Sequence, residues 1–471
     1  MTTRRASARD IVSLVADDFR MLPDPSGGPR TPAPDGPLGW PGYDASRERA
    51  ARRTGESESV VCGTASVGGV RAVLIAFEFG FLGGSLGERT GDRLEAAYTH
   101  ARAHRLPVVP LVATGGSRMQ EGMLALTQLQ RVARQSALTR EAGLPQIAVL
   151  RDPTTGGGWA TLGAGADVVL ALPDAQVGFA GSRVRPPDAD PAAYTARAQV
   201  AAGAADAVVP PAELRDVLGR WLRLLTDGPR ETDHPAAGPP AADPGAPPRP
   251  RPLREPAPVP DALGATDLPR TGWDAVRRAR APERPRARAY LDAYFTHRLA
   301  ISGDRCGGVD PDGMLCGFGV HQGRTVAYAA QTGAATRPAG YRTAARLIRL
   351  ADRLGIPVLT LVDTPGAAND AEAERQGAGA AIAELFGVVA TARTPITTLV
   401  IGEGGSGGAL ALAAPGRTWA TPDSYFSVIA PESAAAILKR PPAEAEATAD
   451  QLRIRPQDLV ELGVIRITRA H

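Results

Sequence analysis

Lysine is almost absent from this sequence of 471 residues, in which Lys439 is the only example. A P-loop needs the pattern G-K-[ST], and the sequence contains none. A biotinyl or lipoyl carrier needs its lysine on an exposed hairpin, whereas Lys439 lies in the segment I-L-K-R-P-P. P-loop nucleotide-binding proteins and self-loaded carrier domains are therefore excluded.

Cysteine is scarce as well. Cys62, Cys306 and Cys316 are scattered, and no C-x-x-C pair occurs, so we expect no disulfide framework, no structural zinc and no other bound metal. The sequence also lacks a run of the roughly 20 apolar residues that a membrane span requires. Its N-terminus lacks the apolar core of a signal peptide. We therefore expect a cytoplasmic protein without a membrane partner.

The net charge of +3 is small for this length and predicts no nucleic-acid partner. The length and the hydrophobic content of 43% allow two packed domains of roughly 200 residues each. Pro, Ala and Gly dominate residues 235–260, which predicts a flexible linker. We expect an N-terminal extension (1–57), a first domain (58–227), a linker (228–285) and a second domain (286–471).

The two predicted domains share one order of elements. Each reads as a hairpin, a helix, a buried strand, a second helix, a strand, a glycine-rich turn, a further strand and final helices, which predicts a duplicated α/β unit. In the first domain these elements are expected at 60–77, 83–104, 107–113, up to 141, and 146–150; in the second, at 314–330, 340–354, 357–362, 371–386 and 395–401. In the extension, helices are expected at 10–19 and 46–53.

Two glycine turns stand out, one in each domain. The segment I-G-E-G-G-S-G-G-A-L-A-L (401–412) follows an apolar strand, and D-P-T-T-G-G-G-W-A (152–160) follows another. Such turns expose backbone N–H groups to an anion or a developing oxyanion. We interpret them as the two oxyanion holes of one active site. A tight strand–helix turn is the alternative for 152–160. A dinucleotide fingerprint is the alternative for 401–412, but Pro415-Gly416 ends the helix too soon for it.

Several motifs, taken in order, resemble a fusion of the β and α subunits of acetyl-CoA carboxylase carboxyltransferase. The β-like motifs are P-L-G-W-P-G-Y (37–43), F-L-G-G-S-L-G (81–87), G-G-S-R-M-Q-E-G (115–122), D-P-T-T-G-G (152–157) and G-F-A-G-S-R-V (178–184). The α-like motifs are G-D-R (303–305), D-T-P-G-A (363–367), I-G-E-G-G-S-G-G-A-L-A-L (401–412), Y-F-S-V-I-A-P-E (425–432) and L-G-V-I (462–465). The resemblance implies an α/β fold with two tandem crotonase-like (ClpP/crotonase ββα superhelix) domains.

The resemblance also implies a function. It is the transfer of a carboxyl group from N-carboxybiotin to the α-carbon of acetyl-CoA or a related short acyl-CoA, giving a malonyl-CoA type product. A separate biotin carboxyl carrier protein and a biotin carboxylase are implied as partners, with no cofactor bound covalently to this chain. Two pairs of backbone N–H groups suffice for this chemistry, so no side-chain nucleophile is required. A homodimer or larger assembly is expected.

The resemblance assigns roles to individual residues. Gly156 and Gly157 are expected to hold the thioester enolate, and Gly407 and Gly408 the ureido oxygen of biotin. Val at Gly408 is expected to block the reaction while the protein stays folded. The residues expected at the acyl-CoA are Gly84, Ser85, Gly116, Arg118, Gln120 and Gly181. The residues expected at biotin are Gly404, Gly405, Tyr425 and Ser427. Ordinary surface charge is the alternative for Arg118 and Gln120, and a core position is the alternative for Tyr425.

The chain departs from the family pattern at several places. The N-terminal four-cysteine zinc ribbon of bacterial β subunits is absent, and Gln331-Thr332-Gly333 stands where the α subunit usually carries a lysine. Two other readings therefore stay open. One is a crotonase-type hydrolase, isomerase or decarboxylase of CoA thioesters, although no carboxylate or histidine stands out near Gly156. The other is a non-catalytic carboxylase subunit that has kept the fold.

Overall fold

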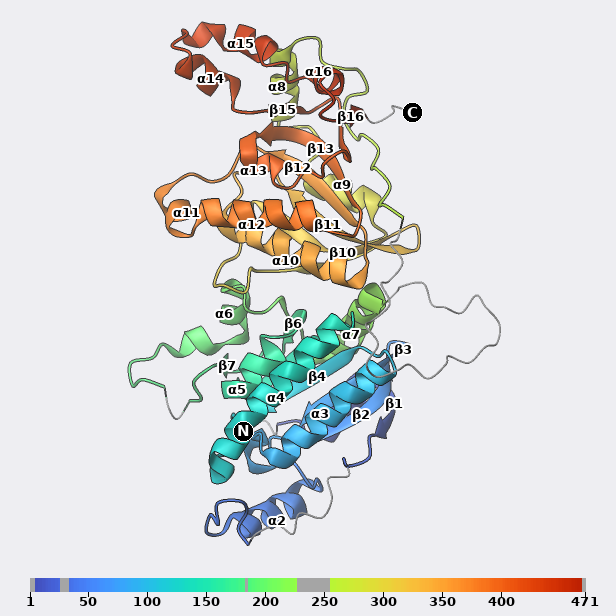
Figure 1. The fold of residues 1–471 in the computed structure, drawn as a ribbon, viewed down its shortest axis with the longest axis vertical. Helices are drawn as coiled ribbons and strands as arrows, with labels where there is room; N and C mark the ends of the chain where they lie inside the picture. Colours follow the sequence, from blue (N-terminus) through green and yellow to red (C-terminus); the bar gives the residue numbers. More distant parts are fainter. Residues whose placement is uncertain (1–4, 26–33, 183–184, 227–254, 468–471) are drawn as a thin grey trace, which may run out of the picture. The chain divides into compact units, whose positions relative to one another are not determined.

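The computed structural model describes residues 5–25, 34–182, 185–226 and 255–467. The chain divides into two units, Met1–Thr226 and Asp227–His471, and each contains a mixed β-sheet with helices packed against it (Figure 1). The core of the expected linker, 235–250, lies outside the described residues. The limits expected for the domains within these units stay predictions.

The sheet of the first unit has eight strands among the described residues, in the order β1-β2-β3-β4-β5-β6-β8, with β7 beside β5. Strands β1, β2 and β3 are antiparallel, and each later pairing is parallel. The strands are β1 (Asp17–Met21), β2 (Val60–Val67), β3 (Val70–Phe77), β4 (Val108–Thr114), β5 (Ile147–Thr155), β6 (Val168–Ala171), β7 (Val177–Gly178) and β8 (Ala207–Val208).

The helices of the first unit join these strands. They are α1 (Ala8–Val15), α2 (Tyr43–Thr54), α3 (Glu88–Ala103), α4 (Gly122–Glu141), α5 (Gly156–Gly158), α6 (Ala196–Ala201) and α7 (Pro211–Thr226). Helices α3 and α4 pack side by side (Figure 1). Helix α1 packs against α7 and β3. Helices α3 and α4 follow β3 and β4, so they make the crossovers that parallel strands require.

The sheet of the second unit repeats this arrangement. Its order is β9-β10-β11-β12-β13-β14-β16, with β15 beside β13. The first two pairings, β9–β10 and β10–β11, are antiparallel and the others are parallel. The strands are β9 (His297–Ile301), β10 (Met314–His321), β11 (Arg324–Gln331), β12 (Val358–Thr364), β13 (Ile396–Gly405), β14 (Thr418–Ala420), β15 (Tyr425–Ser427) and β16 (Arg466–Ile467).

The helices of the second unit include counterparts of those in the first. They are α8 (Gly272–Arg280), α9 (Ala287–Tyr294), α10 (Pro338–Leu354), α11 (Ala371–Arg375), α12 (Ala378–Thr391), α13 (Ser406–Leu410), α14 (Pro431–Ile437), α15 (Ala445–Gln451) and α16 (Pro456–Glu461). Helices α10 and α12 pack together as α3 and α4 do (Figure 1). The predicted duplication of an α/β unit is therefore confirmed strand by strand.

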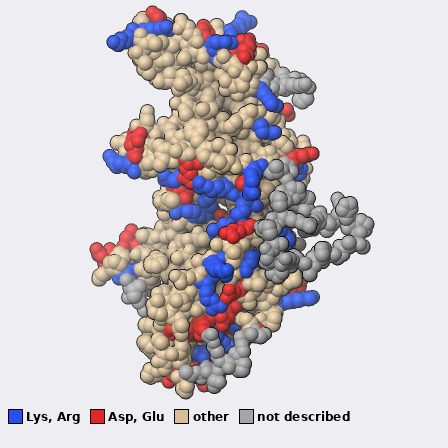
Figure 2. All heavy atoms as spheres, in the orientation of Figure 1, with Lys and Arg blue, Asp and Glu red and all other residues tan. Residues whose placement is uncertain are grey.

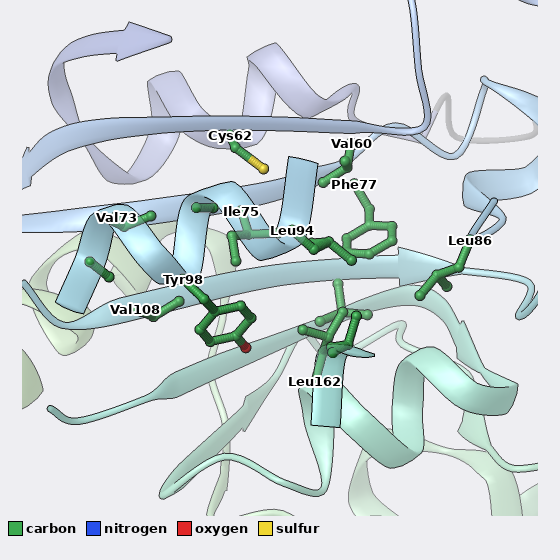
Figure 3. Close-up of a cluster of buried hydrophobic side chains, with 14 of the residues drawn as sticks. Val60, Cys62, Val73, Ile75, Phe77, Leu86, Leu94, Tyr98, Val108 and Leu162 are labelled. Atoms are coloured by element: carbon green, nitrogen blue, oxygen red, sulfur yellow. The ribbon is translucent and has the colours of Figure 1, made fainter. Parts of the chain in front are cut away.

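The core of the first unit lies between the sheet and α3. Figure 3 shows Val73, Ile75 and Phe77 of β3 pointing toward Leu94 and Tyr98 of α3. The strand residues alternate in sequence because successive side chains of a strand point to opposite faces. Each fully buried side chain of this size stabilises the fold by about 1.5–3 kcal/mol. Strand β4 is buried along its whole length, as expected for a central parallel strand.

Three expectations from the sequence need correction. The helix expected at 10–19 ends at Val15, and β1 follows it and pairs with β2 at the sheet edge. The helix expected to open at Gly83 begins only at Glu88, because Gly83 and Gly84 have φ of +69° and +62°, outside the helical range. The helix expected at 371–386 is broken at Gly377, which also has a positive φ.

A helix also forms within the segment that was expected to be a linker. Helix α8 buries Ala275, Val276 and Ala279, which pack in one cluster with Tyr425 and Ala449 of the second unit. The proline-rich composition of 235–260 concealed this short helix, because the whole of 228–285 was expected to be linker. Residues 272–280 are thus part of the folded second unit.

Charged side chains of both signs lie near one another over the face seen in Figure 2. Many charged side chains of the described residues form ion pairs, such as Arg131 with Glu95 and Arg280 with Glu432. Exposed pairs of this kind contribute little stability individually, typically about 0–1 kcal/mol. None of the helices in the described ranges combines the length and apolarity that crossing a membrane would take.

The three cysteines are expected to differ in reactivity. Cys62 and Cys316 are buried, and burial raises the pKa of each thiol to about 12, whereas Cys306 is exposed. Because the thiolate is the reactive form, we expect the native protein at pH 8 to react rapidly with one equivalent of a thiol reagent. The denatured protein should react with three. Rapid reaction of a second thiol in the native protein would contradict the burial.

Candidate active site

The candidate site of each unit lies where two neighbouring parallel strands end. In the first unit Val112 pairs with Leu150, and the next pair is Thr114 with Thr154. The chain thus advances by two residues on β4 and by four on β5. In the second unit Val362 pairs with Val400 and Thr364 with Gly404, which is the same step. This irregularity bends the end of β5 toward β4 in the first unit, and the end of β13 toward β12 in the second.

A turn follows each of these strands. After β4, the N–H of Gly116 donates to the hydroxyl of Thr114 at 3.0 Å. After β12, the N–H of Gly366 donates to the hydroxyl of Thr364 at 3.1 Å. The next residues, Ser117 and Ala367, each form a parallel bridge, with Leu86 and Thr336 respectively. The first turn thus corresponds to the second residue by residue.

The glycine turns follow β5 and β13, as predicted, and lead into α5 and α13. Gly156 and Ser406 open these helices with nearly equal φ, +62° and +60°. A Cβ on Gly156 would lie only 3.1 Å from Cα of Gly116. A Cβ on Gly405 would overlap the carbonyl of Pro365. Backbone therefore touches backbone in both units, which is the physical reason for glycine at these positions.

The backbone N–H groups of the turns differ in availability. The N–H of Gly156 donates to the carbonyl of Phe179 at 3.0 Å, so this amide is engaged within the fold. In the described part of the chain, the N–H groups of Ser117 and Gly157 donate to no protein atom. In the second unit, the N–H groups of Ala367 and Gly407 likewise donate to no protein atom among the described residues. Each unit thus carries one pair of free backbone N–H groups, located on two facing turns.

Gly408 is closely packed against the protein's own atoms. A Cβ there would lie 2.5 Å from the nitrogen of Ala367 and 2.6 Å from the hydroxyl of Tyr341. A valine at 408 would therefore displace the protein's own backbone, and the expectation that the fold tolerates it is wrong. Gly407, in contrast, is exposed, and a Cβ there would meet nothing within 4 Å.

Arg118, which was expected at the acyl-CoA, is buried in a network of charged groups. Its guanidinium donates to both carboxylate oxygens of Glu58, to Glu121 at 3.3 Å and to the hydroxyl of Ser85 at 3.2 Å. Tyr43, from the expected extension, donates to Glu121 as well. Burial acts to raise the pKa of Glu58, but Arg118 outweighs it and lowers that pKa. The network fixes the turn that contains Ser117.

The other residues expected at the acyl-CoA surround this turn. Gly84 is buried, and a Cβ there would overlap the carbonyl of Ala113. Gln120 is half-buried in the short 3-10 helix, Met119–Glu121, that precedes α4. Gly181 is half-buried too, and a Cβ there would lie 3.7 Å from the hydroxyl of Thr155. Their contact with a substrate stays a prediction.

The residues expected at biotin are packed within the second unit. Tyr425 is buried and donates to Glu403 at 2.7 Å, and Ser427 donates to the carbonyl of Ile429 at 2.6 Å. Burial, together with the carboxylate of Glu403, raises the pKa of Tyr425, so its hydroxyl stays protonated. Gly404 lies against the ring of Phe426. Their contact with biotin stays a prediction, but both hydroxyls already have partners in the fold.

A second buried ion pair holds β13 beside β12. Asp363 precedes the turn of Thr364 and is buried; Arg284 donates to its Oδ1 at 2.6 Å, and the N–H of Glu403 donates to the same oxygen at 3.1 Å. Burial raises the pKa of Asp363 more than Arg284 and Arg286 lower it. Sequence reasoning assigned Arg284 to the linker and missed this role.

Sequence reasoning also missed Ser117 and Ala367, although both lie in motifs that it had singled out, G-G-S-R and D-T-P-G-A. Glycine content does not reveal these two amides, because a free amide depends on where neighbouring carbonyls lie. Among the described residues, no group of three or more His, Cys, Asp or Glu side chains is placed to hold a metal ion.

Comparison with known proteins places this geometry in a class. A family model described as acetyl co-enzyme A carboxylase carboxyltransferase-like matches residues 268–468, and one described as a carboxyl transferase domain matches residues 42–196. Solved structures of transcarboxylase 12S superimpose with a TM-score of 0.75 at 19% identity, covering 98% of this chain and 86% of that one. The fold and the repeated turns therefore define a two-domain carboxyltransferase of crotonase-like fold.

Relatives in sequence give the family. The acetyl-coenzyme A carboxylase carboxyl transferase subunits beta/alpha of Salinispora arenicola are 40% identical over 98% of this chain and 81% of their own length. A probable biotin-dependent acyl-coenzyme A carboxylase beta3 subunit of Mycobacterium tuberculosis is 35% identical over 91% of this chain and 84% of its own. This chain belongs to the family of acetyl-CoA carboxylase carboxyl transferase β/α subunits, as the motifs predicted.

The network around Arg118 leads to a stability prediction. Replacing Arg118 with Met leaves the carboxylate of Glu58 buried without its partner, which is expected to lower the free energy of unfolding by about 3–5 kcal/mol. Urea unfolding followed by circular dichroism measures this. The double variant Arg118→Met/Glu58→Leu removes both charges and should recover most of the loss. A single variant as stable as the wild type would contradict a structural role for Arg118.

Proposed function

We propose that this protein transfers a carboxyl group from N-carboxybiotin, borne by a separate carrier protein, to the α-carbon of acetyl-CoA or a related short acyl-CoA. The product is of the malonyl-CoA type. One observation carries the proposal: each unit presents a pair of partner-free amide groups on facing turns, and this transfer develops negative charge on two oxygens. Membership of the carboxyltransferase family supports it.

The first pair suits the acyl-CoA. Removing the α-proton of a thioester moves negative charge onto its carbonyl oxygen. The N–H groups of Ser117 and Gly157 are fixed donors that need no reorganisation to meet this charge. One oxyanion-hole donor typically contributes about 10²–10³ in rate. The network of Arg118 holds one of the two turns, so the donors are preorganised before substrate binds.

The second pair suits the ureido group of carboxybiotin. When the N–CO2 bond breaks, the bond electrons remain on the ureido group and charge develops on its oxygen. The N–H groups of Ala367 and Gly407 are the donors for that oxygen. The freed biotin nitrogen then accepts the α-proton of the thioester, and the resulting enolate carbon attacks the released CO2. No side-chain nucleophile takes part.

Carrier and biotin carboxylase are proposed as separate partners. Lys439, the only lysine, lies just after the end of α14. It has a φ of +56°, and its N–H donates to the carbonyl of Ala436. This is a helix end and not the exposed hairpin of a biotinyl domain. The setting of Lys439 thus supports delivery of the biotin on another protein, charged there by an ATP-dependent carboxylase.

Exposed apolar side chains near each glycine turn support an assembly of at least two copies. Met119 and Phe179 in the first unit are 68% and 74% exposed, and Val428 in the second is 73% exposed. Phe179 and Val428 occupy equivalent positions after β7 and β15. Large exposed apolar side chains around a site favour burial against a partner surface. We propose that the first unit of one copy faces the second unit of another.

Gly407 provides the cleanest test of the second amide pair. In Gly407→Val the new Cβ would meet no protein atom within 4 Å. The side chain would instead occupy the space in front of the free N–H group of residue 407. We expect carboxylation of free biotin at the expense of malonyl-CoA to fall at least about 100-fold. Circular dichroism and thermal unfolding should match the wild type.

Gly387→Ala is the matched control, because Gly387 is also exposed with open space at its Cβ but lies in α12. It should keep full activity. Wild-type rates in Gly407→Val would overturn the assignment of this turn. Hydrolysis or decarboxylation of malonyl-CoA by the wild type, without carboxylation of biotin, would favour a crotonase-type hydrolase or decarboxylase instead.

Complementation tests the assembly. Chains with Gly157→Val and chains with Gly407→Val are each expected to be inactive. If each site combines units of two copies, unfolding and refolding the mixture places one intact site in every mixed dimer and restores part of the activity. An inactive mixture, despite dimers seen by sedimentation, would show that each site is built within one chain.

A further inference from the structure

A buried amide side chain lies directly beneath the glycine turn of the second unit. Gln331, the last residue of β11, is fully buried. Its Nε2 donates to the carbonyl of Gly408 at 3.1 Å and to the hydroxyl of Thr336 at 3.2 Å. Within the described residues, its Oε1 has no hydrogen-bond partner. The turn that carries Gly407 is therefore tied to β11 by one side chain.

The first unit shows that the fold does not require a polar residue here. Strands β3 and β11 have the same length and the same hairpin register, so Phe77 ends β3 where Gln331 ends β11. Leu86 corresponds to Thr336, because each pairs with the turn of its own unit. Phe77 and Leu86 are fully buried members of the apolar core in Figure 3. Two polar residues thus replace two apolar residues at equivalent buried positions.

This replacement carries a cost. A buried amide gives up its hydration, and Gln331 recovers that loss only on its Nε2 side, since Oε1 stays unpaired. A phenylalanine would satisfy packing without this cost, as it does in the first unit. The benefit has to lie in the group that Gln331 holds. This group is the carbonyl of Gly408, the residue after Gly407, whose N–H belongs to the second pair.

We propose that Gln331 is a positioning residue for the second amide pair. By binding the carbonyl of Gly408, it fixes the orientation of the turn and keeps the N–H of Gly407 directed away from the protein. The inference deepens the proposed function, since it assigns Gln331 to the biotin side of the reaction. The first pair, Ser117 and Gly157, lies in the other unit and does not depend on it.

Gln331→Glu tests the hydrogen bond through pH. A protonated glutamic acid at 331 donates its O–H to the carbonyl of Gly408, whereas the carboxylate cannot donate and repels that carbonyl. Burial raises the pKa of such a group. We expect the variant to transfer carboxyl groups at low pH and to lose activity as the pH rises through this pKa. The wild type should show no such loss in the same range.

Gln331→Met removes the donor at all pH values. We expect kcat for biotin carboxylation to fall at least about tenfold, because small misplacements of a catalytic group carry penalties of this order or larger. The KM for malonyl-CoA should stay unchanged. Hydrogen exchange of peptides covering 403–412 should speed up in the same variant, a readout that needs no turnover.

Thr325→Val is the matched control. Thr325 lies at the other end of β11, is buried, and its hydroxyl has no partner among the described residues. This variant should leave kinetics and exchange unchanged. Unchanged exchange at 403–412 in Gln331→Met, or a wild-type pH profile in Gln331→Glu, would overturn the inference. If Gln331→Met exchanges faster than the wild type at 403–412, but the wild type transfers no carboxyl group, the proposed function is overturned and the positioning role stands.

Discussion

The structure depends on backbone contact between two turns at the ends of neighbouring parallel strands. Such strands lie about 4.8 Å apart, and two extra residues on β5 and β13 carry the chain back toward its neighbour. A Cβ on Gly156 would lie 3.1 Å from Cα of Gly116, and both glycines have positive φ. Glycine therefore suits this contact in the first unit. The free amides of Ser117 and Gly157 lie on the two turns that make this contact, and among the described residues no carbonyl accepts them.

The two units solve the same problem with different supports. In the first unit a buried ion pair, Arg118 with Glu58, holds the turn. Tyr43 adds a hydrogen bond from its hydroxyl to Glu121 in the same network. The second uses Arg284 with Asp363 and the amide of Gln331. Duplication thus preserved the backbone of the site, while the side chains beneath it diverged. That division suits a reaction in which two chemically different oxygens acquire charge.

Much of the fold could be predicted from local patterns. The hairpins at Gly68-Gly69 and Gln322-Gly323, the buried strands and the order of elements follow from apolar periodicity and from glycine punctuation. Strand β1 and helix α8 were missed, because a short edge strand and a short helix that follows a proline-rich stretch carry weak local signals. The role of Arg118 was missed for another reason. A charged residue next to a glycine motif is typical of a ligand contact, and only its burial against Glu58 shows that the fold itself uses it.

The sequence alone determined the family, the duplication and the position of both glycine turns, because each depends on motifs or patterns formed by consecutive residues. Tertiary structure decided which amides are free. Gly156 looked like a donor, but the carbonyl of Phe179, brought beside it by β7, accepts its N–H. Ser117 and Ala367 looked ordinary, and they became candidates because no carbonyl in the described structure reaches them. Hydrogen-bond occupancy depends on segments distant in sequence, so a motif can locate a turn but cannot say which of its N–H groups remains available.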